Sequence, residues 1–281
     1  MKYFLIVAFF SFFYFGCSEK AETPVKGKLT VYADEGLYTL VSALADSFKS
    51  VYKAADIKVI SVQAREGIVK IINGETEIFV SSREFNDEEK KAARANKLEY
   101  KTAKFCYDGI YAITGYRSER DTLSFQSIRL LLSGSDSKYK AVIPGANSGV
   151  YEFLKFKINN GADPSGAEIL KSESEILKSV EKDAAKIGFI SANTLQDSTN
   201  FTIMKMGVPG SNGNVTEYLE PHPGYYVQDL YPMTRLCVIY LSESGIGLAS
   251  GFTSYLTGNF GQKFVLDNKL GPAAVPVKVV R

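Results

Sequence analysis

Tryptophan is absent from this sequence, and histidine occurs once, at His222. Histidine is the most frequent general acid or base in enzymes and a common zinc ligand, so a single copy leaves little scope for either role. The 33 basic and 31 acidic residues nearly balance, and the chain therefore lacks the basic field that attracts nucleic acid. We expect no nucleic-acid partner, no metal and no cofactor.

The first seventeen residues have the features of a secretory signal. Lys2 precedes an apolar stretch at 3–15, which is shorter than the roughly 20 residues of a membrane-spanning helix. Gly16 and Cys17 follow, and this pattern resembles a bacterial lipoprotein signal, in which the cysteine is acylated and becomes the first mature residue. The polar segment 18–27 would then be a flexible tether. The resemblance implies a periplasmic or cell-surface lipoprotein; a plain N-terminal membrane anchor is the alternative.

Cysteine is also scarce. If Cys17 carries a lipid, Cys106 and Cys237 are the remaining thiols. In an oxidising compartment two such thiols can pair when their Cα atoms lie within about 7 Å. The sequence leaves two interpretations open, a disulfide or two buried free cysteines.

The pattern of apolar residues predicts two α/β blocks. In the first, strands at 29–35, 57–63 and 77–84 alternate with helices, which is typical of parallel βαβ units that bind ligands beyond the carboxyl ends of their strands. Long apolar strands at 105–115 and 231–242 lie before and after a second block of the same kind. We therefore expect a clamshell whose chain crosses from one lobe to the other and returns.

The predicted lobe boundaries follow from these crossings. Lobe I comprises 28–108 and 237–281, and lobe II comprises 109–236. The tail of lobe I is predicted to form one helix at 248–266 and a closing strand at 275–280.

Three loops lead from strand ends into helix starts, at 34–36, 64–67 and 145–149. The start of a helix carries unpaired N–H groups and about half a positive charge, so each loop is a candidate oxyanion site. Ordinary helix capping explains any one of them equally well. The three together favour an anion-binding cleft.

The order of these segments resembles the phosphate-type periplasmic substrate-binding proteins of ABC importers over most of the mature chain. The resemblance rests on S-S-R-E at 81–84, Asp108, N-S-G at 147–149, Y-P-x-x-R at 231–235, Gly261 and Gln262. The lipoprotein signal and the D-E-G loop resemble the Bacteroidota branch in particular. The family implies an α/β fold, the two-lobed periplasmic-binding-protein clamshell (type II), with a mixed sheet flanked by helices in each lobe and two crossing strands.

The resemblance also implies, position by position, which residues face the anion. These are Glu35, Gly36, Leu37, Tyr38, Arg65, Glu66, Ser82, Arg83, Asn147, Ser148 and Gly149.

This chain departs from the family pattern at three places. Asp34 and Glu35 stand where hydroxyl residues are usual, Pro144 replaces an arginine, and Val150 replaces a threonine. Carboxylates repel a phosphate unless they face away or accept its proton. Arg65 or Arg83 can supply the missing guanidinium, although both also fit surface ion pairs.

We expect a binding protein that is not an enzyme. Ser148 lacks an evident general base, and G-A-N-S-G differs from the G-x-S-x-G of serine hydrolases. The expected function is the capture of a small oxyanion, first of all phosphate, and its delivery by a monomer to an ABC permease. A lipid-anchored sensor or interaction protein with a degenerate anion site is the alternative, which the acidic first loop and Pro144 favour.

Overall fold

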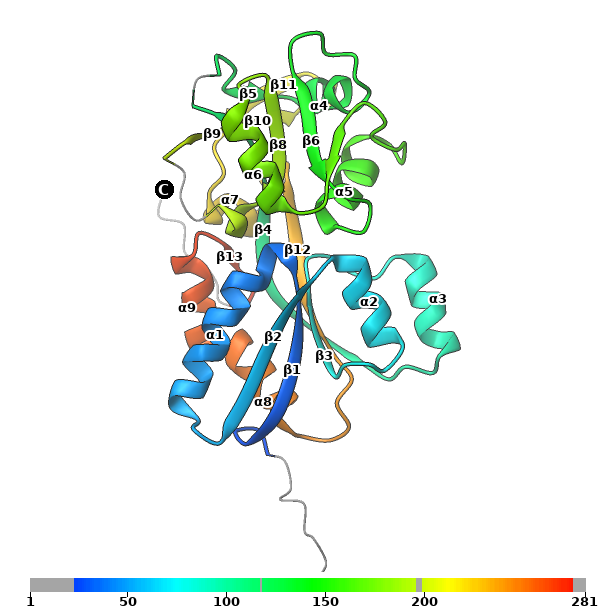
Figure 1. Ribbon diagram of the computed structural model, residues 1–281, viewed down its shortest axis with the longest axis vertical. Helices are drawn as coiled ribbons and strands as arrows, with labels where there is room; N and C mark the ends of the chain where they lie inside the picture. Colours follow the sequence, from blue (N-terminus) through cyan, green and yellow to red (C-terminus); the bar gives the residue numbers. More distant parts are fainter. Residues whose placement is uncertain (1–22, 117, 196–198, 275–281) are drawn as a thin grey trace, which may run out of the picture.

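The computed structural model describes residues 23–116, 118–195 and 199–274. The predicted signal peptide, the first half of the tether and the predicted closing strand lie outside these residues. Two α/β lobes are stacked along the long axis of the molecule (Figure 1). In the described ranges, no helix combines the length and the apolar character that a bilayer crossing requires.

The lower lobe in Figure 1 is built on parallel strands with an antiparallel addition. Its strands are β1 (Gly27–Asp34), β2 (Ala55–Val62), β3 (Ile78–Ser81), β12 (Thr234–Leu241), the short β13 (Gly271–Pro272) and the first half of β4 (Lys101–Gly115). Its helices are η1 (Glu35–Leu37), α1 (Tyr38–Val51), α2 (Ala64–Ile72), α3 (Asp87–Ala95), α8 (Leu248–Thr257) and α9 (Asn259–Asp267). Strand β1 runs parallel to both β2 and β3, as expected for βαβ units.

The upper lobe repeats this arrangement. Its strands are β5 (Thr122–Leu123), β6 (Lys140–Pro144), β7 (Glu168–Leu170), β8 (Lys186–Ser191), β9 (Phe201–Ile203), β10 (Lys205–Pro209) and β11 (Val215–Leu219). Its helical segments are α4 (Phe125–Leu132), α5 (Gly149–Phe153) with its continuation η2 (Leu154–Ile158), α6 (Glu173–Lys182), η3 (Ala192–Thr194) and α7 (Pro223–Val227). Strand β6 pairs in parallel with β7 and β8.

Strand β4 belongs to both lobes. Its first half pairs with β12, and its second half pairs with β8 and β9. One sheet in the order β2-β1-β3-β12-β4-β8-β6-β7 therefore runs through the whole molecule. The predicted α/β clamshell with two mixed-sheet lobes is confirmed, and we propose that the lobes divide near Asp108 on β4 and near Cys237 on β12.

The two cysteines lie opposite each other in this ladder. Cys106 on β4 pairs with Cys237 on β12, and both thiols are free and buried. Burial raises the pKa of the Cys106 thiol well above its usual range.

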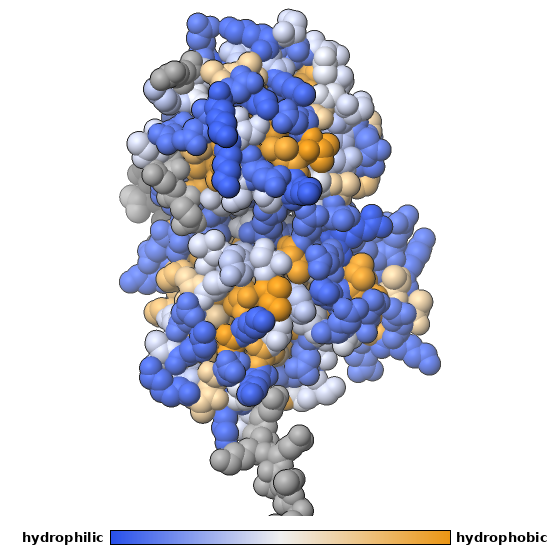
Figure 2. Space-filling model, viewed as in Figure 1, coloured by the Kyte–Doolittle hydropathy of each residue, from blue (hydrophilic) through white to orange (hydrophobic). Residues whose placement is uncertain are grey.

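Helix α1 and helix α3 follow their sequence patterns. The apolar stripe of α1 is buried, as Leu40, Leu44 and Phe48 illustrate. At the start of α3, Asn86 and Glu89 form a capping box, in which each side chain accepts from the other residue's backbone N–H. On the face of the molecule shown in Figure 2, apolar residues form patches within a larger hydrophilic surface.

The predicted helix at 248–266 is wrong, because two helices occupy this segment. Helix α8 ends at Thr257, Gly258 has an extended backbone (ψ 174°), and α9 begins at Asn259. The break places Gln262, which is 1% exposed, against β4. Its Nε2 donates to Phe105 O (2.9 Å) and Leu256 O (3.0 Å). Its Oε1 accepts from the amides of residues 273 and 274 at 2.8 and 3.1 Å.

Replacement of Gln262 by leucine is expected to lower the free energy of unfolding by about 2–4 kcal/mol, because it keeps the volume but removes the hydrogen-bond partners of several buried backbone groups. Urea denaturation measures the change, with Lys263→Ala on the exposed side of α9 as the control. Equal unfolding midpoints for Gln262→Leu and the control would show that Gln262 does not hold the helix break in place.

Candidate functional site

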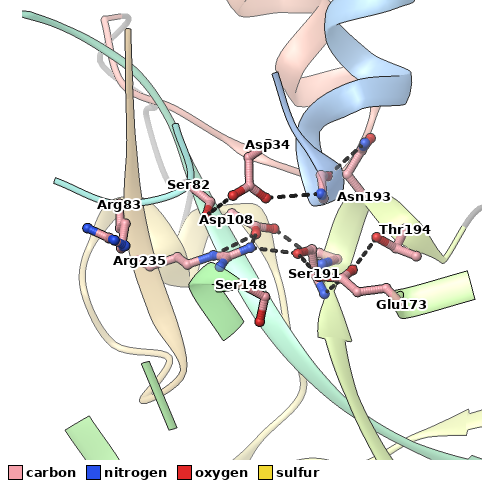
Figure 3. A network of polar contacts seen from close by, with 12 residues as sticks. Asp34, Ser82, Arg83, Asp108, Ser148, Glu173, Ser191, Asn193, Thr194 and Arg235 are labelled. Carbon is pink, nitrogen blue, oxygen red and sulfur yellow. Dashed lines mark hydrogen bonds and ion pairs between the residues drawn. The ribbon is translucent and has the colours of Figure 1, made fainter. Parts of the chain in front are cut away.

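Arg235 lies at the centre of a buried polar network between the lobes (Figure 3). It projects from β12, is 7% exposed and faces Asp108 on β4, its partner in the ladder. Nε and Nη2 donate to Asp108 Oδ2 at 3.0 and 2.7 Å. Nη2 also donates to Ser191 Oγ, at the end of β8, at 2.6 Å. A guanidinium at the waist of the clamshell thereby links β4 to the end of β8 in the upper lobe.

The third nitrogen of the Arg235 guanidinium, Nη1, takes no part in these hydrogen bonds. This nitrogen is buried and has no hydrogen-bond partner among the described residues. It faces Gly149 at the start of α5, because a methyl group placed on Gly149 would lie 2.9 Å from Nη1. Ser148 caps this helix by accepting from Tyr151 N at 3.1 Å. A buried charged N–H without an acceptor costs free energy, which suggests that an acceptor belongs here.

Two glycine–serine contacts join the lobes around Arg235. Gly36 in the lower lobe packs against Ser191 in the upper lobe, and Gly149 in the upper lobe packs against Ser82 in the lower lobe. A side chain on either glycine would overlap the facing serine hydroxyl. Glycine is therefore required at both positions if the lobes are to meet.

Buried carboxylates already use the hydroxyl donors of these serines. Asp34 accepts from Ser82 Oγ (2.8 Å) and from Gly36 N (3.1 Å). Glu173, the first residue of α6, accepts from Ser191 N (2.9 Å) and Ser191 Oγ (2.8 Å), and from Thr194 Oγ1. The carboxylates occupy donors that an oxyanion would otherwise use.

Four further interactions hold the lobes together. Glu35 Oε1 accepts from Glu173 N at 2.9 Å, and Asn193 Nδ2 donates to Gly36 O at 3.1 Å. At the other edge of the cleft, Arg65 N donates to Asn147 O at 3.0 Å. Arg83 forms two 2.7 Å hydrogen bonds with Glu89 of its own lobe, and its Nε lies 2.5 Å from a carboxylate oxygen of Glu152 on α5. The described conformation is closed.

The network contains several carboxyl groups but only one buried guanidinium, that of Arg235. Burial raises the pKa of Asp34, Asp108 and Glu173 above their usual values. Burial, followed by the charge of Glu173, raises the pKa of Glu35 from 4.5 to about 7. Among the described residues, no group of three or more His, Cys, Asp or Glu side chains is arranged to hold a metal ion.

Five of the predicted site residues surround Arg235 or take part in the network. They are Glu35, Gly36, Ser82, Ser148 and Gly149. Leu37 is buried in the hydrophobic core, whereas Tyr38 is 39% exposed.

The remaining predicted residues lie toward the edge of the cleft. Arg65, Glu66 and Asn147 are exposed, and Glu66 faces Lys70 at 3.9 Å. Arg83 is engaged by glutamates of both lobes. Which of the predicted residues contact a ligand stays a prediction.

Seven residues of the network were not predicted from the sequence to bind the ligand. They are Asp34, Asp108, Glu173, Ser191, Asn193, Thr194 and Arg235. A signal was present for two of them, because Asp108 and Arg235 are charged residues inside long apolar strands. Glu173 offered none, since a glutamate in the first turn of a helix is usually a solvated partner of the helix dipole.

The fold and the interlobe network define a two-lobed clamshell with a buried polar waist. A family model described as a PBP superfamily domain matches residues 18–259, and the chain belongs to this family. Comparison with curated proteins gives no match.

Three solved structures illustrate the range of this fold. A putative phosphate ABC transporter substrate-binding protein from Clostridium perfringens, solved with bound phosphate, has a TM-score of 0.75 and 19% identity, covering 88% of this chain and 100% of that one. A phosphate transport receptor from Vibrio cholerae has a TM-score of 0.66 and 15% identity, covering 86% and 99%. The regulatory domain of Synechocystis CcmR, solved with 2-PG, has a TM-score of 0.59 and 12% identity, covering 82% and 96%. Transport receptors and regulatory domains thus share the architecture, and the site must decide between them.

Alanine at Gly36 or Gly149 is expected to prevent full closure, because the added methyl group overlaps a serine of the opposite lobe. Small-angle X-ray scattering should show a larger radius of gyration for both variants than for the wild type. Gly145→Ala is the matched control, since a methyl group there meets only Leu170 O at 3.9 Å. Identical scattering for all four proteins would contradict the proposed contact between the lobes.

Closure is expected to weaken as the pH rises from about 4.5 to 7. In the closed form Glu35 faces the carboxylates of Glu173, Asp34 and Glu175 and has a pKa of about 7, against an ordinary value of 4.5. The closed form therefore binds a proton that a solvated carboxyl group releases across this range, so acid favours closure and higher pH removes that advantage.

The fraction of closed molecules, measured by scattering across this pH range, checks the prediction. Glu35→Gln keeps the acceptor for Glu173 N and should flatten the profile, whereas Glu66→Gln on the exposed face of α2 should leave it unchanged. A profile that Glu35→Gln does not alter would exclude Glu35 as the titrating group.

Proposed function

We propose that this protein is an extracytoplasmic solute-binding lipoprotein that captures a small oxyanion, phosphate being the first candidate, between its lobes and delivers it to an ABC permease. The observation that carries the proposal is the buried Nη1 of Arg235, which has no acceptor in the described part of the chain and faces Gly149. A small anion supplies the missing acceptor through a charge-assisted hydrogen bond. The protein acts by binding, without catalysis.

Opening of the clamshell would separate Gly36 from Ser191 and Gly149 from Ser82. This leaves a space beside Arg235 Nη1 and the start of α5, while the hydroxyls of Ser82 and Ser191 stay bonded to Asp34 and Glu173 within their own lobes. An oxyanion in that space links the lobes and replaces their direct contacts. Because the surroundings are acidic, the guest is one that carries a proton, which Asp34 can accept.

The alternative, a lipid-anchored sensor with a degenerate anion site, also has an observation in its favour. Asp34 and Glu173 already take the hydroxyl donors of Ser82 and Ser191, and Pro144 stands where the family resemblance leads us to expect an arginine. In that case the carboxylate of Glu173 acts as a permanent internal substitute for the anion.

Millimolar phosphate is expected to raise the melting temperature of the wild type, because a ligand that binds only the folded state stabilises it.

Ser148→Ala should weaken the affinity for phosphate by about 1.5–3 kcal/mol, the range for a hydrogen bond to a charged group. The pair Arg235→Met with Asp108→Leu should abolish the response while avoiding a lone buried charge. Titration calorimetry measures both, and Arg94→Ala on the exposed surface of α3 is the arginine control.

The outcomes separate the two functions. A response in the wild type that the double variant retains would place the anion away from Arg235. The absence of any shift in the wild type, with phosphate and with a panel of other oxyanions, would favour the degenerate sensor.

A further inference from the structure

An apolar hollow of about 470 Å³ lies in the lower lobe where the chain enters it. Its apolar and aromatic lining comes from the residues before β1, the end of α1, the loop before α8, and the helices α8 and α9. These residues are Val25, Phe48, Tyr52, Ile246, Tyr255 and Phe260, which we call the basal apolar face. No residue lining the hollow is charged, although 23% of the chain is.

Three members of the basal apolar face are exposed, the two tyrosines are half-buried, and Phe48 is buried. Ile246 is 77% exposed, Phe260 50% and Val25 40%. The ring of Tyr255 packs against those of Phe48 and Phe260, with centroid distances of 5.2 Å in both pairs. Large apolar side chains that gather on a surface mark a contact with a partner or a membrane.

The place where the chain enters the lower lobe indicates what covers the basal apolar face. Thr23 and Lys26 form a turn closed by backbone hydrogen bonds of 3.0 and 3.1 Å. The carbonyl of Pro24 lies directly against Gly251 of α8, where a side chain would overlap it. The chain is therefore fixed beside the hollow, and Thr23 follows Cys17 by six positions. Six residues span at most about 21 Å, so an acylated Cys17 keeps this face close to the bilayer.

We propose that the basal apolar face docks on the surface of the phospholipid bilayer that holds Cys17. This inference rests on the lipid anchor of the proposed function. Tyrosine rings suit the boundary between lipid and water, because one end is apolar and the other polar. Lys26, Lys49 and Lys53 lie next to members of the face in sequence and can meet anionic headgroups. The anchor makes docking intramolecular, so weak affinity is sufficient.

Docking gives the molecule a defined orientation. The entry to β1 lies at the end of the lower lobe that is distant from the upper lobe (Figure 1). A bilayer against the basal apolar face therefore holds the lower lobe at the membrane and leaves the upper lobe free to swing.

An environment-sensitive fluorophore tests the proposal in the full acylated chain, reconstituted in vesicles of phosphatidylcholine and phosphatidylglycerol. The label is attached at Ser254→Cys, an exposed position in the lining of the hollow, or at Ser165→Cys, an exposed position of the upper lobe. Cys106 and Cys237 are buried and should not react in the folded protein. We expect blue-shifted emission and quenching by nitroxide lipids at position 254 and an aqueous signal at position 165.

The double variant Ile246→Asp with Phe260→Asp should return the label at position 254 to an aqueous signal, while flotation with vesicles and the response to phosphate stay unchanged. An aqueous signal at position 254 in a chain that floats with the vesicles overturns docking and leaves the anchor intact. A blue shift without nitroxide quenching assigns the face to a protein contact and also overturns docking. A chain that does not float overturns the anchor and docking together.

Discussion

The ion pair between Arg235 and Asp108 is the interaction on which the arrangement of the two lobes depends. Each residue lies on a strand that runs between the lobes, and the two strands pair directly in the ladder. Asp108 Oδ1 accepts from Ala192 N of the upper lobe at 3.2 Å, while Arg235 reaches Ser191. Removing one partner of such a buried pair usually costs about 3–5 kcal/mol, because the other charge remains buried. The pair therefore fixes the waist of the clamshell and orients the spare Nη1.

The acidic surroundings determine what this waist can bind. Glu35 joins the lobes by accepting from Glu173 N, whereas Asp34 and Glu173 accept from serines and amides of their own lobes. The raised pKa values of all three record the cost of burying them. An incoming anion competes with these internal acceptors and benefits from protonation. In a binding protein, these buried carboxylates favour anions that carry a proton. In a sensor with a degenerate anion site, the same carboxylates replace the anion. The fold alone does not separate these roles, since transport receptors and regulatory domains share it.

The fold was largely predictable from the sequence, whereas the centre of the site was only partly so. Alternating strands and helices, the stripe of α1 and the Asn86 cap are local patterns, and local patterns suffice to place elements. The helix break at Gly258 was missed because it depends on Gln262 contacting β4, a contact distant in sequence. Glycine-rich helix starts indicated Gly36 and Gly149. The partner of the anion was sought in Arg65 and Arg83, because only the tertiary structure brings Arg235 of β12 beside Gly149 and places Arg83 between Glu89 and Glu152.

A crystal structure of the protein grown with phosphate tests the central claim most directly. The account predicts an anion between the lobes, with one oxygen about 3 Å from Arg235 Nη1 and further oxygens near the amide of Gly149 and the hydroxyl of Ser148. A closed structure in which Nη1 bonds to a protein group, with phosphate absent from the cleft or bound elsewhere, would contradict it.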